Sequence, residues 1–549
     1  MQQHPIAAND ERARIPDRFE LSCDWAYVAR GTGHSSTSAA YDCAISLAQD
    51  TLTIAPTLDI QHSRLVARSD RYKTLSLDYT SYLVSTSQLQ RAVETLERGR
   101  ALIWSEMRGL RISVDQIHKV NSHLAGEFDK VNRDLETLTL TISTNSNDNN
   151  QKGGFVGMDP FGRLVVQQRK LLDNRNKLIS EIQALPGLEA FLKPPSFDNL
   201  RSASARGPVI IINHCQWRSD ILILLHSFSP SLITTVDDFY DRATKLRDQL
   251  LAARKDGLDS NQYEDALRFV LKELYELVGR PVIRRLNELS VPEQSRVWWY
   301  PTSVFCSLPL HAMGPIPPHD GRPRYFLDLY IPSYTPTLST LIESNHPGLD
   351  TLDKPSILFV LQPDALLRGA FWEMQVVQAT STKVTTLISA MATPTTVLER
   401  LRDHRFAHIL CHGILEQGKP FDASFKLYKD KLSLLDIVRS RLPNAEFAFL
   451  SAGHTAELTD ESIADEVLHL TAAMQYCGFR SVVGTMWAMA DIDGRDLAEN
   501  FYKRVFSSTK EGVRYYERTA KALRDSVKNL RRKKGMTLER WVNFVHYGA

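Results

Sequence analysis

The chain carries FAHILCHG at residues 406–413 and EFAFLSAG at residues 446–453, and these two segments decide its fold. Each segment begins with a run that is apolar on both faces and ends in small and polar residues. Such runs are typical of strands in a parallel sheet that is covered by helices on both sides. The sequence therefore predicts an α/β domain with a mostly parallel sheet. Its expected strands lie near residues 208–213, 356–362, 406–411, 446–451 and 480–486.

The part of the chain before about residue 195 has a helical pattern instead. Apolar residues recur every three or four positions in 115–140 and in 163–185, as expected of two helices that pack against each other. The Asn-rich tract between them favours a mobile loop at 144–156. The pattern predicts an all-α region of helical hairpins over 18–195, after a disordered N-terminus at 1–17.

Length and composition limit the class of protein. A chain of 549 residues is too long for one core, so more than one domain is expected. The formal net charge of +2 points neither to nucleic acid nor to an acidic membrane surface. The six cysteines are scattered, which is typical of a reducing compartment. Without a secretory signal or a long apolar run, we expect a cytoplasmic protein with no membrane span.

The polar ends of the two quoted segments predict a site. In an open α/β sheet, chemistry gathers at the carboxyl ends of the strands. One segment ends in Cys411-His412-Gly413, and the other ends in Ser451-Ala452-Gly453. A histidine and a nucleophile on neighbouring strand ends would form the arrangement of a cysteine or serine peptidase. The histidine of such a pair is present.

From about residue 205 to 549 the chain resembles the CHAT domain, a caspase-like module that is related to caspases and separases. AHILCHG resembles the family's histidine strand, and SLLDIVRSRLPNAEFAFLSAGHT resembles its nucleophile strand. GFRSVVGTMWAMAD and RWVNFVHYGA are similar to two later strands, while the stretch near 235–290 reads as a helical insertion. WWYPTSVFCSLPLHAMGP resembles the fungal version of the domain, and the helical half resembles the TPR-like region that precedes it. The resemblance implies regulated proteolysis, cell death or defence as the setting.

The resemblance also implies which residues form the site. His412 matches the position of the catalytic base, and Gly453 matches the position at which the family keeps its cysteine. Glycine has no side chain that could attack a carbonyl, so catalysis should be lost. We therefore predict a non-catalytic binding or regulatory protein with protein or peptide partners, and with no cofactor, metal or nucleic acid. The alternatives are an active endopeptidase with an unrecognised nucleophile, and a retained domain beside a functional helical region.

Three other residues near these strand ends could act as nucleophiles. Ser451 should share a face with residue 453 but lie about 6–7 Å further back, where packing or a backbone hydrogen bond is expected. Cys411 should face away from His412 as a buried thiol, because neighbouring strand residues point in opposite directions. Cys215 ends an earlier strand and is the third alternative. His412 itself could be a core histidine with a satisfied hydrogen bond.

Five further residues are candidates for binding in the cleft: Arg218, Asp220, Thr455, Trp487 and Asp491. Arg218 and Asp220 lie where the related caspases recognise a substrate side chain, although a surface pair is the alternative. Thr455 matches the family's threonine, which has a structural or turn-capping role as its alternative. Trp487 and Asp491 are expected to close one wall, with plain core packing as the alternative for Trp487.

A zinc site is the remaining alternative at these segments. His404, His408, Cys411 and His412 are close in sequence. Tetrahedral coordination needs ligands that converge on one point. Because Cys411 faces away and His404 lies outside the apolar run, no metal site is expected.

Overall fold

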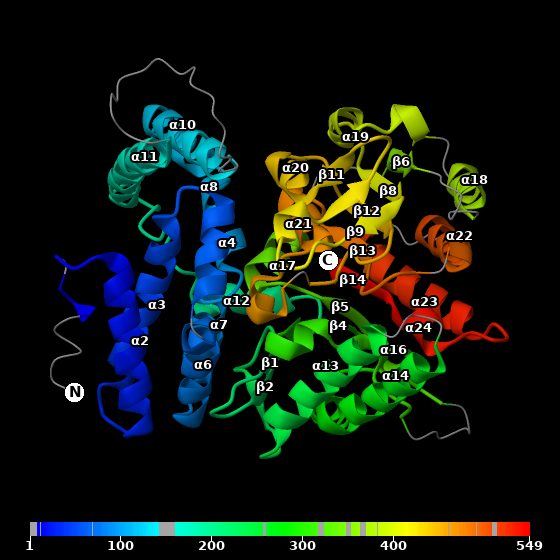
Figure 1. Cartoon of the computed structure of the whole chain (residues 1–549), viewed down its shortest axis with the longest axis horizontal. Coiled ribbons are helices and arrows are strands. Elements are labelled where there is room, and N and C mark those ends of the chain that lie inside the picture. The colour runs from blue at the N-terminus through cyan, green and yellow to red at the C-terminus, as the bar shows by residue number, and fades with distance from the viewer. Residues whose placement is uncertain are drawn as a thin grey trace. The chain divides into compact units, whose positions relative to one another are not determined.

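The computed structural model divides the chain into two compact units (Figure 1). One unit comprises residues 1–83 and 91–196, and the other comprises residues 84–90 and 197–549. The structure describes residues 8–10, 12–68, 70–141, 160–255, 260–316, 323–346, 353–362, 369–380, 383–458, 460–489, 491–507 and 513–549. The loop expected at 144–156 lies outside these residues.

The N-terminal part of the chain is helical, as predicted. Its described helices are α2 Ile15–Gly31, α3 Thr37–Thr53, α4 Leu58–Ala67, α5 Asp70–Lys73, α6 Leu75–Ser85, α7 Leu89–Arg98, α8 Leu102–Leu110, α9 Asp115–Val120, α10 Ser122–Thr139 and α11 Pro160–Gln183. Helices α10 and α11 pack against each other, and Arg175 of α11 donates to Asn132 of α10 at 2.8 Å.

Two details of this region differ from the sequence-based expectation. Residues 115–140 do not form one helix, because Asn121 accepts a hydrogen bond from the N–H of Leu124 and so begins α10 with a new N-terminal cap. The segment 1–17 is not disordered up to its end. Helix α2 begins at Ile15, and a proline in its first turn suits a helix start.

An eleven-stranded sheet forms the centre of the second unit, in the order β3-β2-β1-β4-β5-β14-β13-β12-β8-β6-β7. Its strands are β1 Val209–Asn213, β2 Asp220–Leu224, β3 Ser231–Thr234, β4 Arg296–Pro301, β5 Ile331–Tyr334, β6 Ile357–Leu361, β7 Val384–Ile388, β8 Phe406–Leu410, β12 Phe447–Ser451, β13 Ser481–Thr485 and β14 Phe544–Gly548. Neighbours are parallel except β1–β2, β2–β3 and β13–β14. The predicted mostly parallel sheet is confirmed, and the five expected strands correspond to β1, β6, β8, β12 and β13.

Helices cover both faces of this sheet. The segment near 235–290 forms α13 Phe239–Lys255, α14 Asn261–Leu274, a π-helical turn Tyr275–Gly279 and α15 Arg280–Glu288. The helices that follow are α16 Phe326–Leu329, α17 Leu338–Asn345, α18 Ala370–Thr380, α19 Pro394–Leu401, α20 Leu434–Arg439, α21 Leu470–Cys477, α22 Asp491–Ser507, α23 Thr519–Arg531 and α24 Leu538–Val542. Around β8 and β12, α18 and α22 lie on one side and α20 and α21 on the other (Figure 1).

Strands β6, β8 and β12 end at the same level. Their register pairs Leu361 with Leu410 and Leu410 with Ser451. All three strands are buried along their whole length, because helices cover both faces. On the α22 side, the ring of Phe449 lies 5.1 Å from that of Phe501, and burial of one such side chain stabilises the fold by about 2–3 kcal/mol. This packing fixes the position of the polar residues that follow the strands.

Candidate functional site

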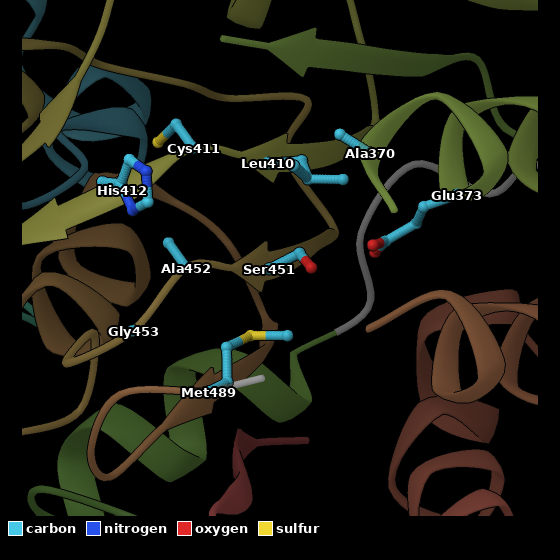
Figure 2. A pocket seen from close by; sticks show the side chains of 9 residues that line it. All are labelled: Ala370, Glu373, Leu410, Cys411, His412, Ser451, Ala452, Gly453 and Met489. Carbon is cyan, nitrogen blue, oxygen red and sulfur yellow. The ribbon is translucent and has the colours of Figure 1, made fainter. Parts of the chain in front are cut away.

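A pocket lies where β8 and β12 end (Figure 2). It has an empty volume of about 410 Å³, part of which is open to solvent. The residues that line it come from α18, the two strand ends, the start of a small second sheet and the segment after β13. They are Ala370, Glu373, Leu410, Cys411, His412, Ser451, Ala452, Gly453 and Met489.

The structure brings His412 and Gly453 to this one pocket. Strand β8 ends at Leu410, and His412 begins β9 (His412–Ile414), which pairs with β10 (Ser424–Lys426) in the second sheet. A Cβ atom built on Gly413 would lie 2.0 Å from the carbonyl oxygen of Gly453. Because only glycine permits so close an approach of two backbones, the two strand ends meet at this point.

The space for a side chain at residue 453 is filled. A Cβ atom on Gly453 would lie 2.9 Å from Cα of Ala488 and 3.6 Å from its Cβ. The side chain of Asn543 holds this backbone in place. It donates to the carbonyls of Trp487 and Ala488 at 3.1 and 3.0 Å and accepts from the N–H of Trp487 at 2.9 Å. Any side chain at 453 would have to displace backbone that three hydrogen bonds fix.

Two oxygen-bearing side chains point toward each other in the pocket, Glu373 from α18 and Ser451 from the end of β12 (Figure 2). They are 2% and 5% exposed, respectively. A Cβ atom built on Gly494 of α22 would lie 2.8 Å from Oε2 of Glu373 and 3.1 Å from Oγ of Ser451, so the two oxygens lie near each other beside the backbone of Gly494. Within the described residues, neither oxygen has a hydrogen-bond partner. Both are therefore available to a ligand.

A buried histidine orients the carboxylate of Glu373. The ring of His408 is 0% exposed and lies between Phe359 and Phe449, with ring centroids 4.6 and 4.8 Å away. Burial, with Glu373 nearby, raises the pKa of Tyr502 well above its usual range. Tyr502 therefore keeps its proton and can donate to Nδ1 of His408, 3.0 Å away, which leaves Nε2–H to donate to Oε1 of Glu373 at 2.9 Å. This chain of hydrogen bonds fixes one carboxylate oxygen and aims the other at the pocket.

Two of the five predicted binding residues, Thr455 and Trp487, lie in the protein core beside the pocket. Thr455 is buried, and its hydroxyl accepts from the N–H of Thr485 at 2.8 Å, which joins the turn after β12 to the end of β13. Trp487 is also buried, and its Nε1 donates to the carbonyl of Glu539 at 3.0 Å. Neither residue lines the pocket, so the structural alternative describes both. The wall expected of Trp487 is formed by Met489.

The predicted pair Arg218 and Asp220 lies in the other half of the sheet. Asp220 opens β2, and the guanidinium of Arg218 binds its carboxylate through two nitrogens, at 2.8 and 2.9 Å. Burial raises the pKa of Asp220 although Arg218 opposes this. The pair is separated from β12 by several strands of the sheet and does not line the pocket. Asp491 starts α22, and its side chain lies outside the described residues.

Each remaining cysteine or histidine candidate is buried or hydrogen-bonded within the protein. Burial raises the pKa of the Cys411 thiol, so this pocket residue stays protonated, and Cys215 is buried near the end of β1. Nδ1 and Nε2 of His404 lie 2.7 and 2.8 Å from the Arg400 carbonyl and the Thr385 hydroxyl. In the described parts of the chain, no three His, Cys, Asp or Glu side chains converge as a metal site would require. Nor is any described helix both long and apolar enough to cross a bilayer.

Sequence reasoning missed Glu373, Ala370 and Met489 as lining residues, and it missed the role of His408. One local signal for Glu373 exists, because it is the only charged residue in the sequence AFWEMQVVQAT of α18. A single carboxylate in an otherwise uncharged helix is unusual for a helix with a solvated face. That signal marks a special position but does not say which strand ends it will meet.

Comparison with known proteins places the second unit in a family. The model of the CHAT domain matches residues 268–549, which is just over half of the chain. Among solved structures, the Saccharomyces cerevisiae separase–securin complex is similar with a TM-score of 0.44 and 9% identity over 99% of this chain and 54% of that chain. The complex of the RgpB pro- and mature domains from Porphyromonas gingivalis gives a TM-score of 0.34 and 9% identity over 57% of this chain and 77% of that chain. No curated protein matches the sequence.

Proposed function

The chain belongs to the CHAT domain family, and from that premise we propose that it is a non-catalytic, caspase-like protein that binds a peptide segment of a partner in the pocket at the ends of β8 and β12. The observation that carries this proposal is at residue 453. Glycine stands where the resemblance expects the nucleophile, and the backbone of Ala488 occupies the space in which a side chain would begin. A site without its nucleophile retains at most the effects of binding and of oriented dipoles.

The other candidate nucleophiles of the pocket support the same proposal. The buried Cys411 has a raised thiol pKa, whereas a reactive cysteine needs a thiolate. Ser451 would need a base, and both ring nitrogens of His408, on the same face of the sheet, are engaged by Tyr502 and Glu373. These groups suit recognition of a ligand better than attack on one.

The finer parts of the proposal rest on the resemblance. They are a TPR-like interaction region over 18–195, a CHAT domain over 205–549, a cytoplasmic location, and a role in cell death or defence in a fungal setting. His412 would then be a remnant of the base position whose ring forms one wall of the binding pocket.

One observation favours the second candidate, an active peptidase. The hydroxyl of Ser451 faces the pocket without a hydrogen-bond partner among the described residues. If the chain cleaves peptides, Ser451 is the residue with which to begin.

The test combines retention and cleavage in one assay. Full-length protein is immobilised and incubated with a peptide library made from a denatured proteome, and mass spectrometry identifies retained peptides and new termini. We expect retained peptides and no new termini above those in a protein-free blank. Termini that disappear in His412→Ala or Ser451→Ala, but persist in the exposed control His123→Ala, would show catalysis and overturn the proposal.

A further inference from the structure

We propose that the pocket recognises a cationic side chain of the partner, an ammonium or a guanidinium group, through Oε2 of Glu373 and Oγ of Ser451. The inference rests on the proposed peptide-binding function and names the chemical class of residue that the pocket takes. It concerns a pair of oxygens that neither the family match nor the sequence motifs assign.

Glu373 places a buried carboxyl group in the pocket. It is 2% exposed, and the one group that binds it among the described residues is His408, whose Nε2 lies 2.9 Å from Oε1. No arginine or lysine of the described chain forms an ion pair with it. Arg495, one residue after Gly494 in α22, is exposed. Its guanidinium carbon lies over the ring of Trp372, 5.3 Å from the ring centroid. Because an unpaired buried charge is costly, a cation supplied by a ligand would complete the site.

The two acceptors are neighbours in the pocket. Oε2 of Glu373 and Oγ of Ser451 lie near each other, both residues line the pocket, and neither oxygen has a partner within the described residues. A carboxylate oxygen accepts hydrogen bonds, and a serine hydroxyl can accept as well. Two neighbouring acceptors suit a group that carries several N–H donors and a positive charge, which lysine and arginine side chains provide.

The walls of the pocket are partly apolar. Ala370, Leu410 and Met489 line the pocket beside the two oxygens and offer apolar surface. Lysine and arginine bury their methylene stems along apolar surface while the charged head reaches a polar partner. An acidic side chain would meet the carboxylate of Glu373 and be repelled. A neutral side chain of the same length would fit the walls but lose the charge-assisted hydrogen bonds.

The first experiment compares peptide pools that differ at one central position. Acetylated, amidated, fluorescein-labelled pentapeptides carry arginine, lysine, citrulline, norleucine or glutamate between flanking positions randomised over alanine, leucine, serine and glycine. Fluorescence anisotropy with the full chain should give at least about tenfold tighter binding of the arginine and lysine pools than of the citrulline and norleucine pools. Glu373→Gln should bring the pools within about twofold of each other, whereas Glu399→Gln, an exposed carboxylate on α19, should leave the preference intact.

The second experiment needs no ligand. The Cβ point on Gly494 that lies 2.8 Å from Oε2 of Glu373 also lies 3.0 Å from Cε of Met489, so a lysine at 489 would carry its ammonium to the carboxylate. We expect Met489→Lys to raise the melting temperature by a few degrees and to abolish binding of the arginine pool, while Met391→Lys, at an exposed methionine outside the pocket, leaves both unchanged. The rise should be absent when Met489→Lys is combined with Glu373→Gln.

The outcomes separate the two proposals. Equal binding of the citrulline and arginine pools, or an unchanged preference in Glu373→Gln, overturns the cationic inference and leaves peptide binding standing. Cleavage of a bound pool overturns the proposed non-catalytic function instead. If no pool binds, the proposed function fails, and the melting temperature of Met489→Lys decides the inference. A Met489→Lys variant that melts no higher than the wild type overturns it.

Discussion

The polar groups at the ends of β1 and β12, two strands of the same sheet, differ in their hydrogen bonding. After β1, the N–H of His214 donates to Oγ1 of Thr302 at 3.0 Å, and the His214 ring nitrogens lie 3.1 Å from Oγ of Ser303 and from the carbonyl of Tyr240. After β12, Ser451 and Glu373 leave one oxygen each without a partner among the described residues, and both face the pocket.

Polar residues at a strand end can serve either the fold or a ligand. At the end of β1 the polar groups bond to one another and hold the loops, so they contribute to stability. At the end of β12, buried aromatic side chains fix the position of the strand ends, and the oxygens of Ser451 and Glu373 are available to a ligand. Substitutions at the first site should therefore change stability, whereas substitutions at the second should change binding, with the glycines that join β8 to β12 as the exception.

The largest effect is expected from Gly413→Ala. The added methyl group would lie 2.0 Å from the carbonyl oxygen of Gly453, so one of the two backbones must move. We expect a loss of about 3 kcal/mol or more in the free energy of unfolding, measured by chemical denaturation. Gly126→Ala is the control, because nothing lies within 4 Å of the added atom. It should be neutral or stabilising by up to about 1 kcal/mol, and equal losses in the two variants would contradict the proposed contact.

The two histidines give the next contrast. His214 is buried and stacked on Tyr240, with centroids 4.3 Å apart, whereas His412 is half-buried at the pocket. His214→Ala should cost about 2–4 kcal/mol through lost packing and unpaired neighbours, and His412→Ala should cost less than about 1 kcal/mol. Both values come from the same denaturation experiment. A larger cost for His412→Ala would mean that its ring supports the fold.

The pH dependence of stability tests whether buried histidines such as His214 support the fold. Burial lowers the pKa of His214 and of His311 to about 4, and that of His469 to about 3, from ordinary values near 6.5. As the pH falls, the unfolded chain binds protons at these histidines before the folded chain does. Their contribution to the free energy of unfolding is therefore fully present above about pH 6.5 and is lost as the pH falls toward 4. A shift of this size corresponds to about 3 kcal/mol for one histidine. Denaturation from pH 7 to pH 4 should show a shallower loss in His214→Gln than in the wild type, and parallel curves would contradict the assignment.

The smallest contrast is between two hydroxyl groups. Thr455 accepts from the N–H of Thr485, so Thr455→Val should leave a buried donor unpaired and cost about 1–3 kcal/mol. Ser451→Ala removes a hydroxyl without a partner among the described residues and should change stability by no more than about 0.5 kcal/mol. Thermal melts of the two variants measure this difference. A large loss in Ser451→Ala would show that its hydroxyl serves the fold and not a ligand.

The sheet could be predicted from the sequence because its signals are local. Runs that are apolar on both faces identify β1, β6, β8, β12 and β13, and their order along the chain fits a parallel sheet. The break at Asn121 was not predicted, because the apolar stripe continues through it and only the cap interrupts the helix. The start of α2 at Ile15 was not predicted either. The residues before it, 1–14, are mostly polar, so no apolar pattern marks the point at which the helix begins.

The site could be predicted only where it lies on the quoted strands. His412 and Gly453 follow directly from two strand ends that the fold makes neighbours. Glu373 comes from a helix that precedes β8, and Asn543 comes from the end of the chain, so no local pattern shows that they meet residues 451 and 488. Two of the predicted binding residues do not line the pocket, for a physical reason. Thr455 and Trp487 satisfy their own polar groups in the core, which sequence alone does not reveal.

Whether this site is catalytic can be measured as the rate at which the purified full-length chain hydrolyses a broad fluorogenic peptide library, compared with His412→Ala and with a protein-free blank. Because the space at residue 453 is filled by backbone and no side chain stands there, we expect all three rates to be equal. Hydrolysis by the wild type that disappears in His412→Ala would contradict the proposed loss of catalysis, since it would show that the histidine still serves a nucleophile at this pocket.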